Sequence, residues 1–245
     1  MSGQVDHDPL SPIPRAVARS RGGRLHASLA AWSLAAALLG VTTADALAID
    51  IKVVDDTDGK GTAMLLTGQV VAGDGLKVRS FVAGLPASRP ITAQLAFAGG
   101  ARVDAVSIGQ FFHQARIRTL VPAKQRCNSP CPLVLVGGRD SLTGKASYIK
   151  YSSAALGFTG VVSNYAEKEY TVADLDAAVA NAQREILQIA DYLHGVGANI
   201  NMLKYYQSVL KSNEVQYITN EQALDLGIAV FFEETGQVIE PLPLR

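Results

Sequence analysis

The stretch IRTLVPAKQRCNSPCPLVLVGG, residues 117–138, contains the turn that decides the fold. An apolar run ends at Pro122, and a second apolar run follows the pentapeptide CNSPC at residues 127–131. This order predicts a strand over 118–121, a turn over the pentapeptide and a helix over 130–136. Ser129 then stands where a strand runs into a helix, which suits a serine nucleophile. It equally suits a helix cap, because serine is a preferred N-cap residue and proline is favoured at the first helical position.

Outward from this turn, short apolar strands alternate with segments that have apolar residues at helical spacing. Strands are predicted near residues 64–68, 91–97, 145–152 and 228–232, and helices over 76–83, 103–115, 171–195, 200–210 and 219–227. Thr219 and Gln222 form a capping-box pattern at the start of the last helix. The sequence therefore predicts an α/β protein with a mostly parallel sheet and a mainly helical C-terminal third.

Composition limits the class of protein and its partners. The chain has 245 residues, with 22 basic and 22 acidic side chains. No nucleic-acid partner is expected, because phosphate binding needs concentrated positive charge. We expect one domain over residues 49–245, preceded by an N-terminal extension over residues 1–48.

The N-terminal extension has the order of a secretory signal. Four arginines between residues 15 and 24 precede an apolar run over 27–41, and Ala46-Leu47-Ala48 follows. This order predicts cleavage after about Ala48 and a periplasmic or secreted protein. The alternative is an uncleaved membrane anchor over residues 27–41. The run is shorter than the roughly 20 residues of a spanning helix, which favours cleavage.

The two cysteines of the chain, Cys127 and Cys131, are candidates for a disulfide. In an oxidising compartment two cysteines are more often bonded than free. On one helical turn their Cα atoms would lie about 6 Å apart, within the range that a disulfide tolerates. A zinc site is the weaker alternative, because two thiolates without a histidine pair fall short of four ligands. We therefore predict no metal site and no cofactor.

Four motifs occur in an order that resembles a known superfamily. They are LTGQV at residues 66–70 with Gly73-Asp74, FAGG at 97–100, CNSPC at 127–131 and YITNEQALDLGI at 217–228. In order and spacing they are similar to the Clp-type serine peptidases and the crotonase superfamily, especially the exported branch. The resemblance covers about residues 62–232. It implies a crotonase/Clp-like core of repeated β-β-α units and a homo-oligomer.

In that superfamily a serine is the acylation nucleophile, a histidine is its base, an acid orients the histidine, and two backbone N–H groups hold the oxyanion. The resemblance places Ser129 at the nucleophile position and Gly99 and Gly100 at the first half of the oxyanion hole. No histidine occurs near the end of the 145–152 strand, where the base is expected. Glu214 is nearest to the position of the acid. Pro130 replaces the residue that supplies the second N–H, and proline has none.

These departures predict an impaired enzyme. Losing one oxyanion donor costs about 10²–10³ in turnover, and losing the base leaves only about 10³–10⁴ over water. We therefore expect an exported protein that binds a peptide or a protein partner. The resemblance implies that such a peptide adds as a strand beside Gly99-Gly100.

Two other functions are compatible with the sequence. One is an active serine hydrolase in which Lys150 serves Ser129 as base, if a dry pocket keeps its amine neutral. The simpler interpretation of Lys150 is an exposed charge at a strand end. A displaced His113 or His194 is a further candidate base, although both suit structural roles. The other function is an assembly protein whose helices 175–193 and 200–210 mediate oligomer contacts.

Overall fold

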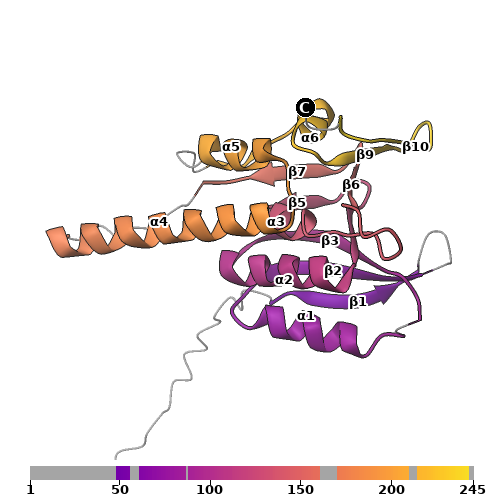
Figure 1. Cartoon of the computed structure of the whole chain (residues 1–245), viewed down its shortest axis with the longest axis horizontal. Helices are drawn as coiled ribbons and strands as arrows, with labels where there is room; N and C mark the ends of the chain where they lie inside the picture. The colour runs from indigo at the N-terminus through magenta and orange to yellow at the C-terminus, as the bar shows by residue number, and fades with distance from the viewer. Residues whose placement is uncertain (1–47, 56–60, 87, 161–169, 210–213, 243–245) are drawn as a thin grey trace, which may run out of the picture. The chain divides into compact units, whose positions relative to one another are not determined.

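The computed structural model describes residues 48–55, 61–86, 88–160, 170–209 and 214–242 (Figure 1). The predicted signal and the alternative anchor lie outside these residues. The strands of the described part are β1 (Asp50–Val54), β2 (Thr62–Val70), β3 (Ile91–Gly100), β4 (Arg118–Val121), β5 (Arg126–Asn128), β6 (Tyr148–Tyr151), β7 (Ala155–Phe158), β8 (Gln216–Tyr217), β9 (Ala229–Phe232) and β10 (Gln237–Ile239). Its helices are α1 (Asp74–Ala83), α2 (Arg102–Ala115), α3 (Cys131–Leu135), α4 (Val172–Gly195), α5 (Ile200–Val209) and α6 (Asn220–Asp225). In this part of the chain we find no helix with the length and apolar character needed to cross a membrane.

The centre of the sheet is β3, which pairs with three other strands. β2 runs parallel to it along its whole length, from Ile91 to Gly100. On the opposite edge, β4 pairs with residues 92–94 and β5 pairs with Ala98. The sheet therefore divides into two arms, which we call the β4 arm (β4-β6-β9-β10) and the β5 arm (β5-β7-β8).

Most of the strand pairs are parallel. Among the described strands, antiparallel pairing joins β1 to β2, β7 to β8 and β9 to β10. The remaining pairs are parallel and connect through helices or long loops, as the alternating sequence pattern indicated. The predicted α/β class with a mostly parallel sheet is confirmed, whereas the repeated β-β-α units stay a prediction.

Local sequence signals predicted the bounds of several elements at the residues where the structure has them. β4 occupies the predicted residues 118–121, and α4 ends at Gly195 as predicted. Thr171 with Asp174, and Thr219 with Gln222, form complete capping boxes at the starts of α4 and α6. Each box satisfies two N–H groups that a helix start would otherwise leave unpaired. The C-terminal third is mainly helical as predicted, although it also contains the β9–β10 hairpin.

The pentapeptide is not a simple turn, contrary to the sequence prediction. Its first two residues, Cys127 and Asn128, complete strand β5, and α3 begins only at Cys131. Cys127 therefore lies on a strand and not on the helical turn that its spacing suggested. A strand of three residues is too short for apolar alternation to reveal it.

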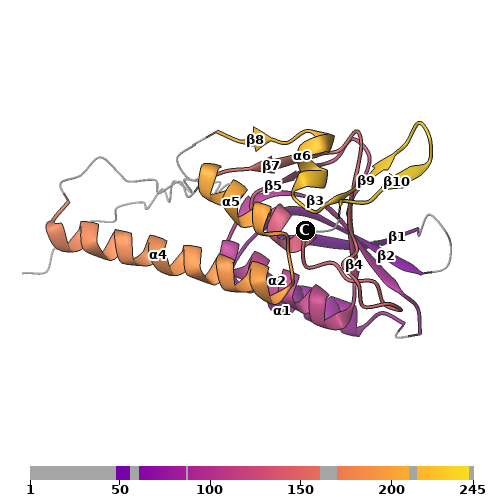
Figure 2. The same cartoon turned by 45° about the horizontal axis from the view of Figure 1, so that its top comes forward.

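Close packing against two helices fixes α3, the segment that follows Ser129. A Cβ atom on Gly109 of α2 would lie 2.9 Å from the Leu133 carbonyl oxygen and 2.1 Å from the Tyr192 hydroxyl. Glycine at this position therefore permits the close approach of α2 to α3 and α4. The buried Tyr192 hydroxyl, on α4, donates to the Leu133 carbonyl at 2.6 Å. Figures 1 and 2 both show α2 and α4 side by side.

Candidate functional site

Ser129 lies between β5 and α3, and backbone groups bond each of its polar atoms. Its N–H donates to the Gly157 carbonyl at 3.0 Å, and its own carbonyl accepts from the Gly99 N–H at 3.0 Å. Its hydroxyl accepts from the Thr159 N–H, also at 3.0 Å. The residue is 7% exposed, and its peptide bond to Pro130 is cis. Ser129 is thus a buried serine that the surrounding backbone holds in place.

Ser129 does not cap α3. The N-cap residue of this helix is Pro130, and no side-chain hydrogen bond caps it. The Ser129 hydroxyl instead meets the segment that follows β7, where Thr159 lies. The interpretation of Ser129 as a helix cap is therefore wrong.

The glycine pair ends β3 in the left-handed region, with φ of 82° at Gly99 and 111° at Gly100. A Cβ atom on Gly100 would come within 1.9 Å of the Val70 carbonyl oxygen, so only glycine fits there. The Gly99 N–H is already bonded to the Ser129 carbonyl. Because Pro130 has no N–H, the expected oxyanion hole lacks its second donor as well.

The strand edges beside the glycine pair are occupied. Gly100 pairs with Val70 of β2, and Ala98 pairs with Asn128 of β5. A peptide cannot add as a strand next to Gly99-Gly100 without displacing one of these neighbours. The mode of peptide binding that the resemblance implied is therefore not available in this structure.

The titratable side chain that faces Ser129 is Tyr206 of α5, which is buried. Its hydroxyl lies next to the Ser129 hydroxyl, and this contact favours the ionised phenol. Burial raises the pKa of Tyr206 well above its usual value, which the contact with Ser129 and the charge of Arg102 only partly oppose. A phenol that remains protonated cannot accept the Ser129 proton. A tyrosine at apolar spacing on a helix looks like a core residue in sequence, so this contact had no sequence signal.

Lys150 is buried, with 1% of its surface exposed. The interpretation as an exposed charge is therefore wrong. Its amine donates to the Asn220 side-chain oxygen and, at 3.5 Å, to the Ser152 carbonyl. Burial lowers the pKa of Lys150, and the nearby charge of Glu233 opposes this effect. Lys150 belongs to the β4 arm whereas Ser129 follows β5, and no hydrogen bond in the described part of the chain joins the two.

Glu214 is exposed and lies two residues before β8, in the same arm as Ser129. His194 is in the last turn of α4, and no hydrogen bond among the described residues connects it to Ser129. His113 accepts a hydrogen bond at Nδ1 from Arg139 at 3.1 Å. Burial and the Arg139 charge both lower the pKa of His113, so it acts as a neutral acceptor in a structural contact.

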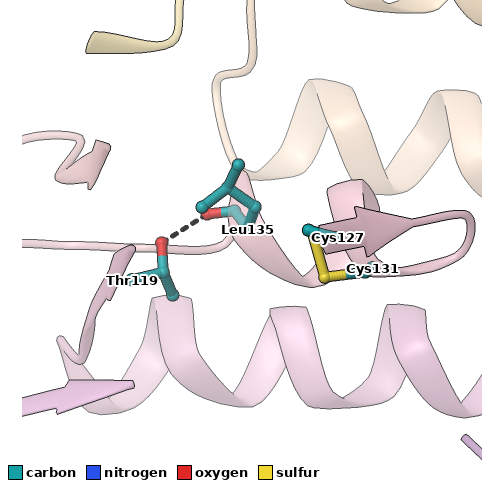
Figure 3. The surroundings of a disulfide bond; sticks show 4 residues. All are labelled: Thr119, Cys127, Cys131 and Leu135. Atoms are coloured by element: carbon teal, nitrogen blue, oxygen red, sulfur yellow. Dashed lines mark hydrogen bonds between the residues drawn. A yellow bond between two sulfur atoms is a disulfide. The ribbon is translucent and has the colours of Figure 1, made fainter. Parts of the chain in front are cut away.

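Cys127 and Cys131 form a disulfide, as predicted, with their Cα atoms 5.2 Å apart (Figure 3). Both cysteines are fully buried. With both sulfurs in the bond, neither is a thiolate ligand for zinc. At the other end of α3, the Thr119 hydroxyl donates to the Leu135 carbonyl at 2.6 Å. The segment after Ser129 is therefore fixed at both ends.

A groove of about 370 Å³ is lined by residues of α2 and α4. An apolar floor of Val106, Ile189 and Tyr192 lies among polar side chains. The ion pair between Arg102 and Glu185, at 2.8 Å, joins the two helices across it. The groove is open to a ligand, whereas Ser129 is not among the residues that line it.

In comparisons with known proteins, the chain matched none of the family models searched and none of the curated proteins.

Proposed function

We propose that this chain is an exported, catalytically impaired relative of the Clp-type serine peptidases that acts by protein–protein association. The bonding of Ser129 is the observation that carries the proposal. Its hydroxyl accepts a backbone N–H, and its carbonyl occupies the Gly99 N–H. The buried disulfide supports export, because such bonds persist mainly in oxidising compartments.

Acyl transfer needs a base for the serine proton and donors for the developing oxyanion. The hydroxyl next to Ser129 belongs to Tyr206, whose raised pKa makes it a poor base. Of the two expected oxyanion donors, one is bonded within the fold and the other is replaced by Pro130. The lost donors and the missing base all act on the acylation step. Each missing donor lowers turnover by roughly 10²–10³, and the missing base lowers it further.

The proposed contact surface is an apolar seam on α4. Its residues are spaced alternately three and four apart, the pattern of a coiled-coil seam. The seam consists of Val172, Leu175, Val179, Ala182, Ile186, Ile189 and Leu193. Ile189 and Leu193 are buried in the chain's own core, whereas Val172, Leu175 and Val179 are 75%, 51% and 56% exposed. In Figures 1 and 2 this end of α4 extends past α2 and α5.

The seam continues beyond the core, and the described part of the chain leaves its first residues exposed. Exposed apolar patches of this kind mark sites of association. The groove between α2 and α4 lies beside the buried end of the seam and shares Ile189 with it. A protein partner with an amphipathic helix would cover both.

A fluorophosphonate probe tests the loss of catalysis. We expect the purified protein to show no more label than its Ser129→Ala variant, because the titratable group beside the hydroxyl in the described part of the chain is a protonated phenol. Intact-mass measurement gives the labelled fraction, with an active serine hydrolase in the same tube as the positive control. Stoichiometric labelling at Ser129 would contradict the proposal and favour a hydrolase with an unusual base.

A further inference from the structure

Close to the first described residue, the backbone of Ile49 makes a buried contact with Asp74 at the start of α1. Ile49 is fully buried, and its N–H donates to Oδ2 of Asp74 at 3.2 Å. Asp74 is 3% exposed and also accepts the Val71 N–H at 2.7 Å. Ala48, one residue earlier, is exposed. The chain thus passes from the solvent to a buried carboxylate within one residue.

The peptide bond between Ala48 and Ile49 is also the bond at which the sequence predicts signal cleavage. We propose that Asp74 forms a binding site for the chain's own new N-terminus, the α-ammonium group that cleavage creates at Ile49. Hydrolysis adds one water across the bond, leaving a carboxylate on Ala48 and an amine on Ile49 that takes up a proton at neutral pH. The inference rests on the proposed export.

The charge balance at Asp74 suits an ammonium group better than an amide. A buried carboxylate is costly unless a cation pairs with it. Among the described ion pairs none includes Asp74, and the nearby Lys77 amine donates instead to the Ile49 carbonyl. An amide N–H at Ile49 offers Asp74 a neutral donor, whereas an ammonium at the same nitrogen offers a full positive charge. Cleavage would therefore supply the missing counter-charge.

The site is connected to the glycine pair. Asp74 accepts the Val71 N–H in the loop between β2 and α1, and Asp104 of α2 accepts the N–H groups of Gly73 in the same loop and of Gly75 in the first turn of α1. The residue before this loop, Val70, pairs with Gly100 and accepts the Ala101 N–H at 2.7 Å. Pairing of the new ammonium with Asp74 would therefore stabilise the end of β2 against the end of β3.

Four proteins test the proposal. The described residues belong to one compact unit, and a chain that begins at Ile49 lacks only Ala48 of them. The chain that begins at Ile49 and the chain that begins at Ala48 are each prepared with Asp74 and with Asp74→Asn, and the unfolding of all four in urea is measured. The start at Ala48 is the matched control, because it carries the same ammonium one residue away, at an exposed position.

We expect Asp74→Asn to raise the unfolding equilibrium constant at least about tenfold more in the Ile49 chain than in the Ala48 chain. The substitution leaves a buried ammonium without its counter-charge only in the former. Equal costs of Asp74→Asn in the two chains would overturn the proposal.

A pH series gives a second readout. The groups near the ammonium are Asp74 and Lys77 of α1, Asp104 of α2 and Asp50 of β1. Pairing raises the amine's pKa above its ordinary value of about 8, so the stabilisation is full below that pH and is lost as pH rises through the folded-state pKa. The Ile49 chain should lose stability above about pH 8 relative to the Ala48 chain, and parallel profiles would contradict the pairing.

Sequencing the N-terminus of the exported protein separates this inference from the proposed function. A start at Ile49 supports the inference, and any other start overturns it. Neither result changes the expectation for Ser129, which the fluorophosphonate probe tests independently.

Discussion

At the scale of single residues, Lys150 is a lysine buried among neutral oxygens. Its amine bonds the Asn220 side chain and the Ser152 carbonyl, while Glu233 is bonded by Ser152 and Ser153. Residue type alone predicted an exposed charge, because lysine is rarely buried unless it is paired. Its burial depends on neighbours that are distant in sequence: β4 and β9 on either side of β6, and α6, whose Asn220 its amine contacts.

The burial of Lys150 has a consequence for pH. Its pKa is lowered by burial, so the folded protein releases a proton that the unfolded chain keeps up to about pH 10. The contribution of Lys150 to the free energy of unfolding therefore increases as pH rises from the folded-state pKa toward about 10. We expect Lys150→Met to remove this increase, as measured by urea unfolding at several pH values.

The control for Lys150 is Lys145→Met, which replaces an exposed lysine three residues before β6. This variant should keep the pH profile of the parent. Parallel profiles for the parent and Lys150→Met would show that the Lys150 amine is not desolvated.

At the scale of elements, the sequence of α4 predicts where the helix begins and ends but not which part of it packs against the core. Its capping box and its last residue follow from the sequence, because both are local hydrogen-bond and spacing signals. The same seam spacing runs through its buried and its exposed parts. Which part meets the core depends on where α2 and α5 end, and spacing within α4 carries no information on that.

The exposed half of the α4 seam is complementary to itself. In an antiparallel pair of copies, Leu175 would meet the partner's Val179, and Val172 would meet the partner's Ala182, so each layer contains apolar residues from both helices. Packing Leu175 against the partner's Val179, and Val179 against the partner's Leu175, would remove both side chains from water. We therefore expect a second copy of the chain to be a partner at this surface.

Substitution of the seam tests this pairing. We expect Leu175→Gln with Val179→Gln to shift the protein from dimer to monomer while retaining its helical circular dichroism, because glutamine keeps helix propensity but loses the apolar contact. Sedimentation velocity over a range of concentrations measures the shift. Leu142→Gln, at a residue that is 81% exposed outside the helices, is the control and should change nothing. A parent that is monomeric at every concentration would refute the pairing.

At the scale of the whole molecule, α3 links the two arms of the sheet. The disulfide joins its first residue, Cys131, to Cys127 on the β5 arm. The Thr119 hydroxyl joins its last residue, Leu135, to the β4 arm. Since the arms share only β3 as a common strand, these two links at α3 hold them together at the position of Ser129.

Removal of the disulfide tests this linkage. We expect Cys127→Ala with Cys131→Ala to lower the free energy of unfolding by about 2 kcal/mol, the entropic value for so short a loop. Treating the parent with reductant should have the same effect, as measured by urea unfolding. Thr119→Val is the companion variant and should cost about 1 kcal/mol for the lost hydrogen bond. An unchanged urea midpoint under reducing conditions would show that the bond does not stabilise the fold.

The sequence by itself determined the α/β class, most of the longer elements, the absence of a histidine near the 145–152 strand and the missing N–H of Pro130, and it made Cys127 and Cys131 candidates for a disulfide. Periodicity, caps and residue identity are local properties, so one segment suffices to recognise them. The short strands β5 and β8 could not be predicted in this way, because three or two residues show no period.

Only the tertiary structure decided how the Ser129 site is filled. The contacts that matter there and nearby join residues far apart in the chain: Thr159 with Ser129 over 30 positions, Lys150 with Asn220 over 70, and Ile49 with Asp74 over 25. Each depends on which strand lies beside which, and a strand's own residues do not specify its neighbour. At Ser129, pairing of β3 with β5 placed the Ser129 carbonyl on the Gly99 N–H.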